Sequence, residues 1–297
     1  MKLLAALTNF LTTTSVTMAA SVPLRIVSFN IRYAAISLEK NEKPWSDRRT
    51  GLINQLKSVT ANASEAGAVL VLGLQEVLDA QLNDIEKGLG SDVWAHFGFG
   101  RDDGKKKGEY NPVFYRTDVL KLLYSEQKWL SPTPDEVSFG WGAGSRRVSV
   151  IAVFEHIATG KRFIHANTHL DNVSSQARSE GIKVVLSRIK AAQDKYGPLG
   201  VTLTGDFNSE PGGDAYAALE DSGYLVELWN SGAKRLGTNQ LTYTGFSTTG
   251  KSRIDFVWFG PKGEDRYAAQ QFEFLNNDID GVFISDHRAV VADLTVL

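Results

Sequence analysis

The apolar positions along the chain fall into two patterns, short apolar runs and longer stretches with helical spacing. Short runs rich in β-branched and aromatic residues predict strands. They occupy residues 24–32, 68–74, 94–100, 112–115, 119–124, 147–156, 162–170, 201–206, 254–259 and 289–296. The run 68–74 contains no polar side chain, as expected for a strand buried on both faces. Thr159 and Gly160 separate two of the runs and predict a hairpin turn.

Helical spacing is present in three segments between these runs. Asp47 predicts the N-terminal cap of a helix whose apolar face covers 52–59. A short helix is expected over 78–87, and Ser174 or Ser175 predicts the start of a helix with an apolar face over 182–189. Because hairpins and crossover helices both occur, the pattern predicts an α/β domain with mixed sheets.

The first twenty residues resemble a secretory signal peptide. Lys2 precedes a short apolar stretch, the residues at 19–21 are small, and no acidic residue occurs before Glu39. We therefore expect a signal peptide over 1–20, a single domain over 21–297, a secreted protein and no transmembrane segment. A soluble N-terminal arm is the alternative. Sequons at Asn62 and Asn172 fit a secreted glycoprotein.

Composition narrows the chemistry. The chain has 297 residues, of which 42% are hydrophobic and 22% are charged, so extended disorder is excluded. The formal net charge of −2 does not favour a strongly basic nucleic-acid binder. The absence of cysteine excludes a disulfide framework, a thiol nucleophile and thiolate metal sites. Catalysis or metal binding must therefore use oxygen and imidazole groups.

Polar residues that can bind metal or move protons end, or lie within, six of the strand-like segments. They are Asn30, Glu76, His169 with Asp171, Asp206 with Asn208, Asp255, and Asp286 with His287. In α/β proteins, ligands gather at strand ends, where loops hold polar groups over a rigid sheet. Burying several carboxylates together is unfavourable unless a cation neutralises them. Oxygen-rich ligands favour Mg²⁺, with Mn²⁺ or Ca²⁺ as substitutes.

These motifs resemble the endonuclease/exonuclease/phosphatase superfamily, which includes deoxyribonucleases, apurinic endonucleases, deadenylases, inositol polyphosphate 5-phosphatases and sphingomyelinases. The motifs are FN, LQE, NTHLD, TGDFN, IDFVWF and SDH, in that order across residues 24–297. Segments 28–32, 100–104 and 108–116, together with Trp45, Arg48 and Arg49, are similar to an uncharacterised secreted or periplasmic branch.

The resemblance implies a deoxyribonuclease-I-like fold, a four-layer α/β/β/α sandwich of two mixed sheets with the active site at one edge. It implies that Asn30 and Glu76 hold the divalent metal and that Asp286 orients water or assists the metal. The remaining catalytic residues would be His169, Asp206, Asn208, Asp255, His287 and Glu109.

The catalytic residues have separate expected roles. Asp206 and Asn208 would position the attacking water and the scissile phosphate, with Asp206 as the candidate base. His287 would be the principal imidazole, with Asp255 as its carboxylate partner. His169 would contact a phosphate or leaving oxygen, and Glu109 would orient that imidazole.

Several residues are candidates for choosing the substrate. Trp141, followed by Arg146 and Arg147, could form an aromatic and cationic wall, with core packing of Trp141 as the alternative. Arg178 could reach the phosphate or form a surface ion pair. Lysines at 105–107 could meet phosphates or simply be solvated. The related branch often has histidine where this chain has Asn172, and the spacer 34–44 is unusual. A glycan on Asn172 would stand beside the site.

We therefore expect a monomeric, divalent-metal-dependent phosphodiesterase with nuclease-like chemistry. One alternative is a phosphatase or phosphodiesterase for small sugar, inositol or lipid-headgroup phosphates. A catalytically inactive binding scaffold is the alternative from another class.

Overall fold

The structure is a computed structural model that describes residues 21–297, so the predicted signal peptide at 1–20 lies outside the described residues. The helices of the described part are α1 (Trp45–Glu65), α2 (Asp79–Leu89), α3 (Ser175–Tyr196) and α4 (Asp214–Asp221). One sheet contains β1 (Val22–Asn30), β2 (Val69–Gln75), β3 (Trp94–Phe97), β4 (Val113–Arg116), β10 (Lys234–Arg235), β12 (Tyr267–Phe274) and β15 (Val290–Val296). The other contains β5 (Leu120–Trp129), β6 (Val148–His156), β7 (Arg162–His169), β8 (Gly200–Asp206), β9 (Val226–Glu227) and β11 (Asp255–Gly260). A small hairpin consists of β13 (Asp278–Ile279) and β14 (Val282–Phe283).

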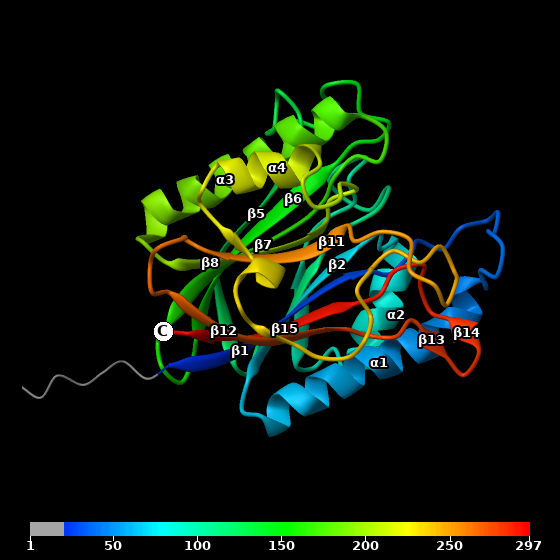
Figure 1. Ribbon diagram of the computed structural model, residues 1–297, viewed down its shortest axis with the longest axis horizontal. Coiled ribbons are helices and arrows are strands. Elements are labelled where there is room, and N and C mark those ends of the chain that lie inside the picture. The colour runs from blue at the N-terminus through cyan, green and yellow to red at the C-terminus, as the bar shows by residue number, and fades with distance from the viewer. Residues whose placement is uncertain (1–20) are drawn as a thin grey trace, which may run out of the picture.

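The two large sheets pack face to face and carry helices on their outer faces. The strand orders are β10-β12-β15-β1-β2-β4-β3 and β5-β6-β7-β8-β11-β9. Figure 1 shows α3 and α4 on the outer side of the second sheet, and α1 and α2 on the outer side of the first. This arrangement confirms the four-layer α/β/β/α sandwich expected from the motifs. Within residues 21–297, no helix is both long and apolar enough to cross a bilayer.

Three apolar layers hold the sandwich together. Between the sheets, Ile26 and Phe154 are fully buried in a common cluster. Leu52 on α1 packs over Leu72 of the first sheet, and Ile189 on α3 belongs to the cluster under the second. Burying a large apolar side chain contributes about 1.5–3 kcal/mol, so these layers account for the main favourable contribution to folding.

Strand direction brings the polar strand ends to one edge. β1 runs parallel to β2, and Asn30 pairs with Gln75 at their ends. β7 likewise runs parallel to β8, and His169 pairs with Asp206. β11 is antiparallel to β8, so its first residue, Asp255, lies opposite Asp206. Residues far apart in the sequence therefore converge because parallel crossovers end their strands on the same side.

The two sheets approach each other closely beneath this edge. A Cβ atom added to Gly73 would lie 2.2 Å from Thr204 Oγ1 of the opposite sheet. Asn167 also bridges the sheets, since its Oδ1 accepts a hydrogen bond from Gln75 Nε2 (2.7 Å) and its Nδ2 donates to Leu74 O (2.8 Å). These contacts fix the spacing of the two halves of the site.

Some expected boundaries differ from the structure. α1 begins at Trp45, so Asp47 lies in its first turn and not at its cap. Ser174 does cap α3, since its Oγ accepts from Ala177 N at 3.1 Å. β12 and α4 were not expected. α4 has only eight residues, and the pairing of β12 with β15 shifts register between residues 269 and 271, which breaks the two-residue alternation.

Candidate active site

A cavity of about 530 Å³ opens at the edge where the polar strand ends meet. It is lined by Arg32, Tyr33, Glu39, Glu76, Arg101, Glu109, Ser145, Arg147, His169, Asn172, Asp206, Asn208, Tyr243, Ile254, Asp286 and His287. Two predicted site residues are absent from this lining but are hydrogen-bonded to residues in it: the predicted metal ligand Asn30 donates to Glu76, and the predicted catalytic residue Asp255 accepts from His287. Loops from both sheets therefore form one concave site.

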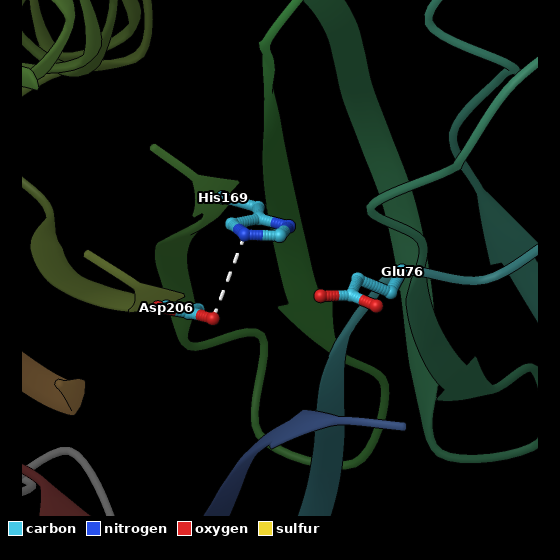
Figure 2. Close-up of side chains that lie close together, drawn as sticks. All are labelled: Glu76, His169 and Asp206. Carbon is cyan, nitrogen blue, oxygen red and sulfur yellow. Dashed lines mark ion pairs between the residues drawn. The ribbon is translucent and has the colours of Figure 1, made fainter. Parts of the chain in front are cut away.

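Three potential metal-binding side chains meet at the floor of the cavity. Figure 2 shows Glu76, which follows β2, facing His169 and Asp206 from the ends of β7 and β8. One ligand atom of each residue lies within 4.8 Å of the others. His169 Nε2 is 3.5 Å from Asp206 Oδ2. Oxygen and imidazole donors at these separations suit a divalent cation.

Asn30 joins two of these acidic groups. Its Nδ2 donates to Glu76 Oε1 (2.9 Å) and to Asp206 Oδ2 (2.8 Å), while its Oδ1 accepts from Arg32 N (2.9 Å). The amide therefore lies between two carboxylates that would otherwise repel each other. To serve as a metal ligand, Asn30 would have to turn its oxygen toward them.

The pKa values of the site carboxyls indicate a deficit of positive charge. Burial and the nearby Asp255 carboxylate raise the pKa of Asp206 to about 7. Burial, with the Glu76 carboxylate adding to it, raises the pKa of Asp286 to about 6. Both shifts arise because buried carboxylates lie close together, and a bound dication would reverse them. The residues present therefore fit the divalent metal expected from the motifs.

Backbone conformation helps to aim the cavity residues. Glu76 leaves β2 with φ 60°, Asn208 follows β8 with φ 47°, and Arg32 follows β1 with φ 59°. The left-handed region is tolerated by asparagine but is uncommon for glutamate and arginine. Strain of this kind is concentrated at functional sites. Here the strained residues are Glu76 and Arg32, and both line the cavity just after their strands end.

His287 is held as a charged imidazole. Its Nδ1 is 2.8 Å from Asp255 Oδ2, and its Nε2 is 3.7 Å from Asp206 Oδ2. Burial acts to lower the pKa of His287, but Asp255 and Asp286 outweigh it and raise that pKa well above its ordinary value. Because Asp255 accepts from Nδ1, the proton on Nε2 faces the cavity.

His169 has the opposite character. Burial, together with Arg147 and Arg101, holds the pKa of His169 well below its ordinary value, so the ring is neutral. Asn208 Nδ2 lies 3.0 Å from Nε2 and donates to it, which leaves the proton on Nδ1. Nδ1 is 3.8 Å from Glu109 Oε2. Glu109 therefore lies on the side of His169 that the motifs implied, at slightly more than hydrogen-bond distance.

Three arginines line the cavity, and of these only Arg147 was a candidate from the sequence, as part of the expected cationic wall. Arg101 Nη1 donates to Glu109 Oε2 at 2.7 Å, and Arg147 Nε lies 3.5 Å from Asp171 Oδ1. Arg32 Nε donates to the buried Glu42 Oε1 at 3.0 Å, on the loop that follows β1. All three come from loops or strand ends, where no periodic pattern signals them. Arg32 and Arg101 were visible in the sequence only as parts of motif segments.

Two predicted substrate residues lie elsewhere. Arg178 does not line the cavity. Its guanidinium forms a bidentate pair with Asp214, from Nη2 to Oδ2 (2.6 Å) and from Nε to Oδ1 (3.0 Å), and its Nη1 donates to Asp171 O (3.0 Å). Trp141 also lies outside the lining, on a loop where its carbonyl accepts from Ser174 Oγ. Asn172 is exposed and lines the cavity, as expected, and its Oδ1 accepts from Arg147 Nη2 at 2.9 Å.

Comparison with protein families gives one match across this architecture. Residues 27–287 match the model of the Endonuclease/Exonuclease/phosphatase family. Among curated protein sequences, none matches the chain.

Several solved structures are similar over nearly the whole chain. An endonuclease/exonuclease/phosphatase family protein from Bacteroides thetaiotaomicron is 27% identical, with a TM-score of 0.84, over 94% of this chain and 97% of that one. A mannosyl-6-phosphatase from the same organism is 28% identical, with a TM-score of 0.80, over 91% of this chain and 99% of that one. The catalytic domain of human Nocturnin shares the fold at 17% identity, with a TM-score of 0.70, over 93% of this chain and 94% of that one.

Proposed function

The chain belongs to the Endonuclease/Exonuclease/phosphatase family, whose members are phosphoester hydrolases, and we propose that it removes phosphate from small phosphorylated molecules with the help of a divalent metal. The observation that carries the proposal is the meeting of Glu76, His169 and Asp206 on the cavity floor, beside the His287–Asp255 pair. This set offers a cation site, a base and a charged donor in one place.

The chain's own residues supply the proton chemistry. Water attacks phosphorus and the Asp206 carboxylate takes its proton, a role that its place on the cavity wall beside the Nε2 atoms of His169 and His287 allows. As the bond between phosphorus and the sugar oxygen breaks, Nε2–H of His287 donates its proton to the leaving oxygen, and Asp255 holds the imidazole in this orientation through Nδ1. Asn208 holds the neutral His169 in place. Mg²⁺, when bound by Glu76 and its neighbours, would supply Lewis-acid stabilisation of the phosphoryl group.

Two observations favour a small phosphomonoester over the nuclease-like substrate expected from the motifs. The cavity has a volume of about 530 Å³, in the range of sites for small ligands. The mannosyl-6-phosphatase of Bacteroides thetaiotaomicron is 28% identical to this chain, whereas Nocturnin is 17% identical. A sugar phosphate is therefore the first substrate class to test.

A phosphodiester substrate is the second candidate. The exposed lysines at 105–107 follow the cavity residue Arg101 in the same loop and could contact neighbouring phosphates of a nucleic acid. They do not themselves line the cavity. Their contribution would be sensitive to salt, which makes it easy to recognise.

A substrate panel separates these candidates. Initial rates would be measured with a hexose 6-phosphate, p-nitrophenyl phosphate, bis-p-nitrophenyl phosphate, single-stranded DNA and RNA, each with Mg²⁺ and with a chelator. We expect metal-dependent phosphate release with the highest kcat/KM on the hexose phosphate. Preference for DNA, RNA or the diester would favour the second candidate, and no hydrolysis of any substrate would favour a binding scaffold.

We also propose that the protein is secreted. The support is the signal-like pattern at 1–20 and the exposure of both sequon asparagines, Asn62 and Asn172. N-terminal sequencing of protein exported from its host should find a mature chain that starts near residue 21. Retention of the full N-terminus inside the cell would contradict secretion.

A further inference from the structure

The loop after β1 contains an arginine of the cavity wall, Arg32, whose positive charge is balanced by a buried carboxylate of the same loop, Glu42. Arg32 Nε donates to Glu42 Oε1 at 3.0 Å, and its Nη2 donates to Glu42 Oε2 at 3.2 Å. The Glu42 side chain is fully buried, and that of Arg32 is 12% exposed. The guanidinium also stacks on Tyr33, 4.6 Å from the ring centroid. The positive charge of Arg32 is therefore matched by one buried carboxylate in fixed, two-point geometry.

Glu39 lies on the same loop and adds a second carboxylate. It lines the cavity, and its side chain is 51% exposed. Its Oε1 accepts one long hydrogen bond, at 3.3 Å, from Arg32 Nη2, and within residues 21–297 it has no other ion-pair partner. Because Glu42 already balances Arg32, the charge of Glu39 is left largely uncompensated at the cavity.

The loop holds Glu39 in place. Glu39 N donates to Glu42 Oε2 at 2.8 Å, and Glu42 N donates to Glu39 O at 3.1 Å. Asn41 Nδ2 donates to Phe246 O at 3.1 Å, which ties the loop to a segment beside the cavity residue Tyr243. Glu39 is thus a feature of an ordered loop, within the spacer 34–44.

The charges of the cavity lining favour a substrate that carries a single phosphate. The lining has three arginines and five carboxylates, so the carboxylates exceed the arginines by two before the histidines are counted. One divalent cation offsets that excess. Arg101 and Arg147 have their own acidic partners, Glu109 and Asp171. No arginine of the described lining is therefore left without a carboxylate to meet a second phosphate on the same molecule.

We propose that Glu39 is a specificity-determining residue that restricts the enzyme to substrates carrying a single phosphate and disfavours those with a second one. The proposal rests on the proposed function and extends it to the part of the substrate other than the phosphate that is removed. That part is uncharged and carries hydroxyl groups. The carboxylate can accept hydrogen bonds from such hydroxyls, whereas it repels a second phosphate group.

The test compares one sugar with and without the second charge. kcat/KM would be measured on a hexose 6-phosphate and on the corresponding 1,6-bisphosphate for the wild type, Glu39→Gln, Glu39→Lys and the control Glu65→Gln. Glu65 is an exposed glutamate at the far end of α1. We expect Glu39→Gln to raise the bisphosphate-to-monophosphate ratio by about fivefold or more, mainly through KM, as one partly screened charge allows. Glu39→Lys should raise it further, and Glu65→Gln should leave it unchanged.

Three other outcomes would contradict the proposal about Glu39, and one of them would also contradict the proposed function. If the wild type hydrolyses the monophosphate but the ratio is unchanged in both folded Glu39 variants, the proposal is wrong while the proposed function stands. If the control raises the ratio as much as Glu39→Gln, the effect is one of net charge and the proposal is also wrong. If the wild type hydrolyses no phosphoester in the presence of metal, the proposed function fails and the proposal fails with it. Equal thermal midpoints for the variants and the wild type establish that all are folded.

Discussion

Single residues on the cavity floor differ sharply in protonation. Asp255 and Asp286 keep His287 charged, whereas burial and two nearby arginines keep His169 neutral. The two imidazoles are therefore not interchangeable. His287 can stabilise negative charge directly, and His169 acts through its fixed contacts with Asn208 and its proximity to Glu109.

The pair formed by His287 and Asp255 should act as one unit. His287→Ala should lower kcat by at least about a hundredfold, as expected for loss of a group that stabilises the transition state. Asp255→Asn should reproduce much of this loss, because it removes the partner that keeps the imidazole charged and oriented. The measurement is kcat for both single variants and the double variant. Strong non-additivity is expected, and independent losses that multiply in the double variant would separate the two residues.

The sequence revealed the residues that follow apolar runs or belong to motifs. Asp206 and His287 stand next to apolar runs, where a polar side chain is conspicuous, and Glu109 lies in a motif segment on a loop. Glu39 lies in the spacer 34–44, which stood out only as an unusual segment, so no pattern indicates that this particular side chain reaches the cavity. The left-handed conformation of Glu76 has no sequence signature either, because that region is unusual for glutamate.

At the scale of elements, one buried arginine joins the loops around the site to α1. Arg48 lies on the first turns of α1 and is fully buried. Its guanidinium donates five hydrogen bonds of 2.8–3.2 Å to backbone carbonyls, those of Ile31, Arg32, Tyr33, Lys43 and Ile284. The carbonyls of residues 31–33 follow Asn30 at the end of β1, and the carbonyl of Ile284 lies two residues before Asp286. Arg48 therefore sets the distance between two parts of the site.

Loss of this arginine should destabilise the fold. Arg48→Met removes the donors of five carbonyls, several of them buried, and should cost at least about 3 kcal/mol in unfolding free energy. Arg48→Lys should recover only part of this, because an ammonium group has three donors. Urea unfolding monitored by tryptophan fluorescence measures both. Arg49→Met is the matched control. The Arg49 side chain, next to Arg48 in the sequence, is 49% exposed, so its loss should change the unfolding free energy by no more than about 0.5 kcal/mol. Equal effects at positions 48 and 49 would refute the role of Arg48.

Helices and strands were predicted correctly where their apolar pattern is regular and were missed where it is not. β2 was expected because its buried, uninterrupted apolar run has no other good explanation. The hairpin of β6 and β7 was also confirmed, with antiparallel pairing across the predicted turn. β12 was missed because its bulge mixes small and polar residues with the apolar ones. Its position in the sheet depends on pairing with β15, a long-range contact that no local pattern records.

For the whole molecule, the site's buried charges link folding to pH and metal. Burial and the Glu76 carboxylate raise the pKa of Glu109 to about 7, and Asp206 has a similar value for its own reasons. In the unfolded chain an aspartyl carboxyl loses its proton near its ordinary pKa of 3.8. Around neutral pH the folded state therefore binds more protons than the unfolded state, so stability falls as pH rises. His287, whose folded pKa is also raised, contributes in the same direction.

The metal-free protein should accordingly melt at a lower temperature at pH 8.5 than at pH 6.5. The comparison starts at 6.5, the ordinary pKa of histidine, because below it the lowered pKa of His169 acts in the opposite sense. Differential scanning fluorimetry in a chelator measures the trend. Mg²⁺ should raise the midpoint more at the higher pH, since metal and protons compete for the same carboxylates. A midpoint that rises with pH in the chelator would contradict this charge arrangement.

The most direct test of the account is a Mg²⁺ titration of phosphate release from a hexose 6-phosphate by the wild type and by Glu76→Gln. Glu76 faces Asp206 and His169 on the cavity floor, and the substitution removes one charge with little change in shape. The wild-type rate should rise to saturation with Mg²⁺ and disappear in a chelator. Glu76→Gln should melt at or above the wild-type temperature in the chelator yet lose at least about a hundredfold in kcat/KM, and excess metal should not restore it. A Glu76→Gln enzyme with the wild-type rate and the wild-type Mg²⁺ dependence would contradict the assignment of the site.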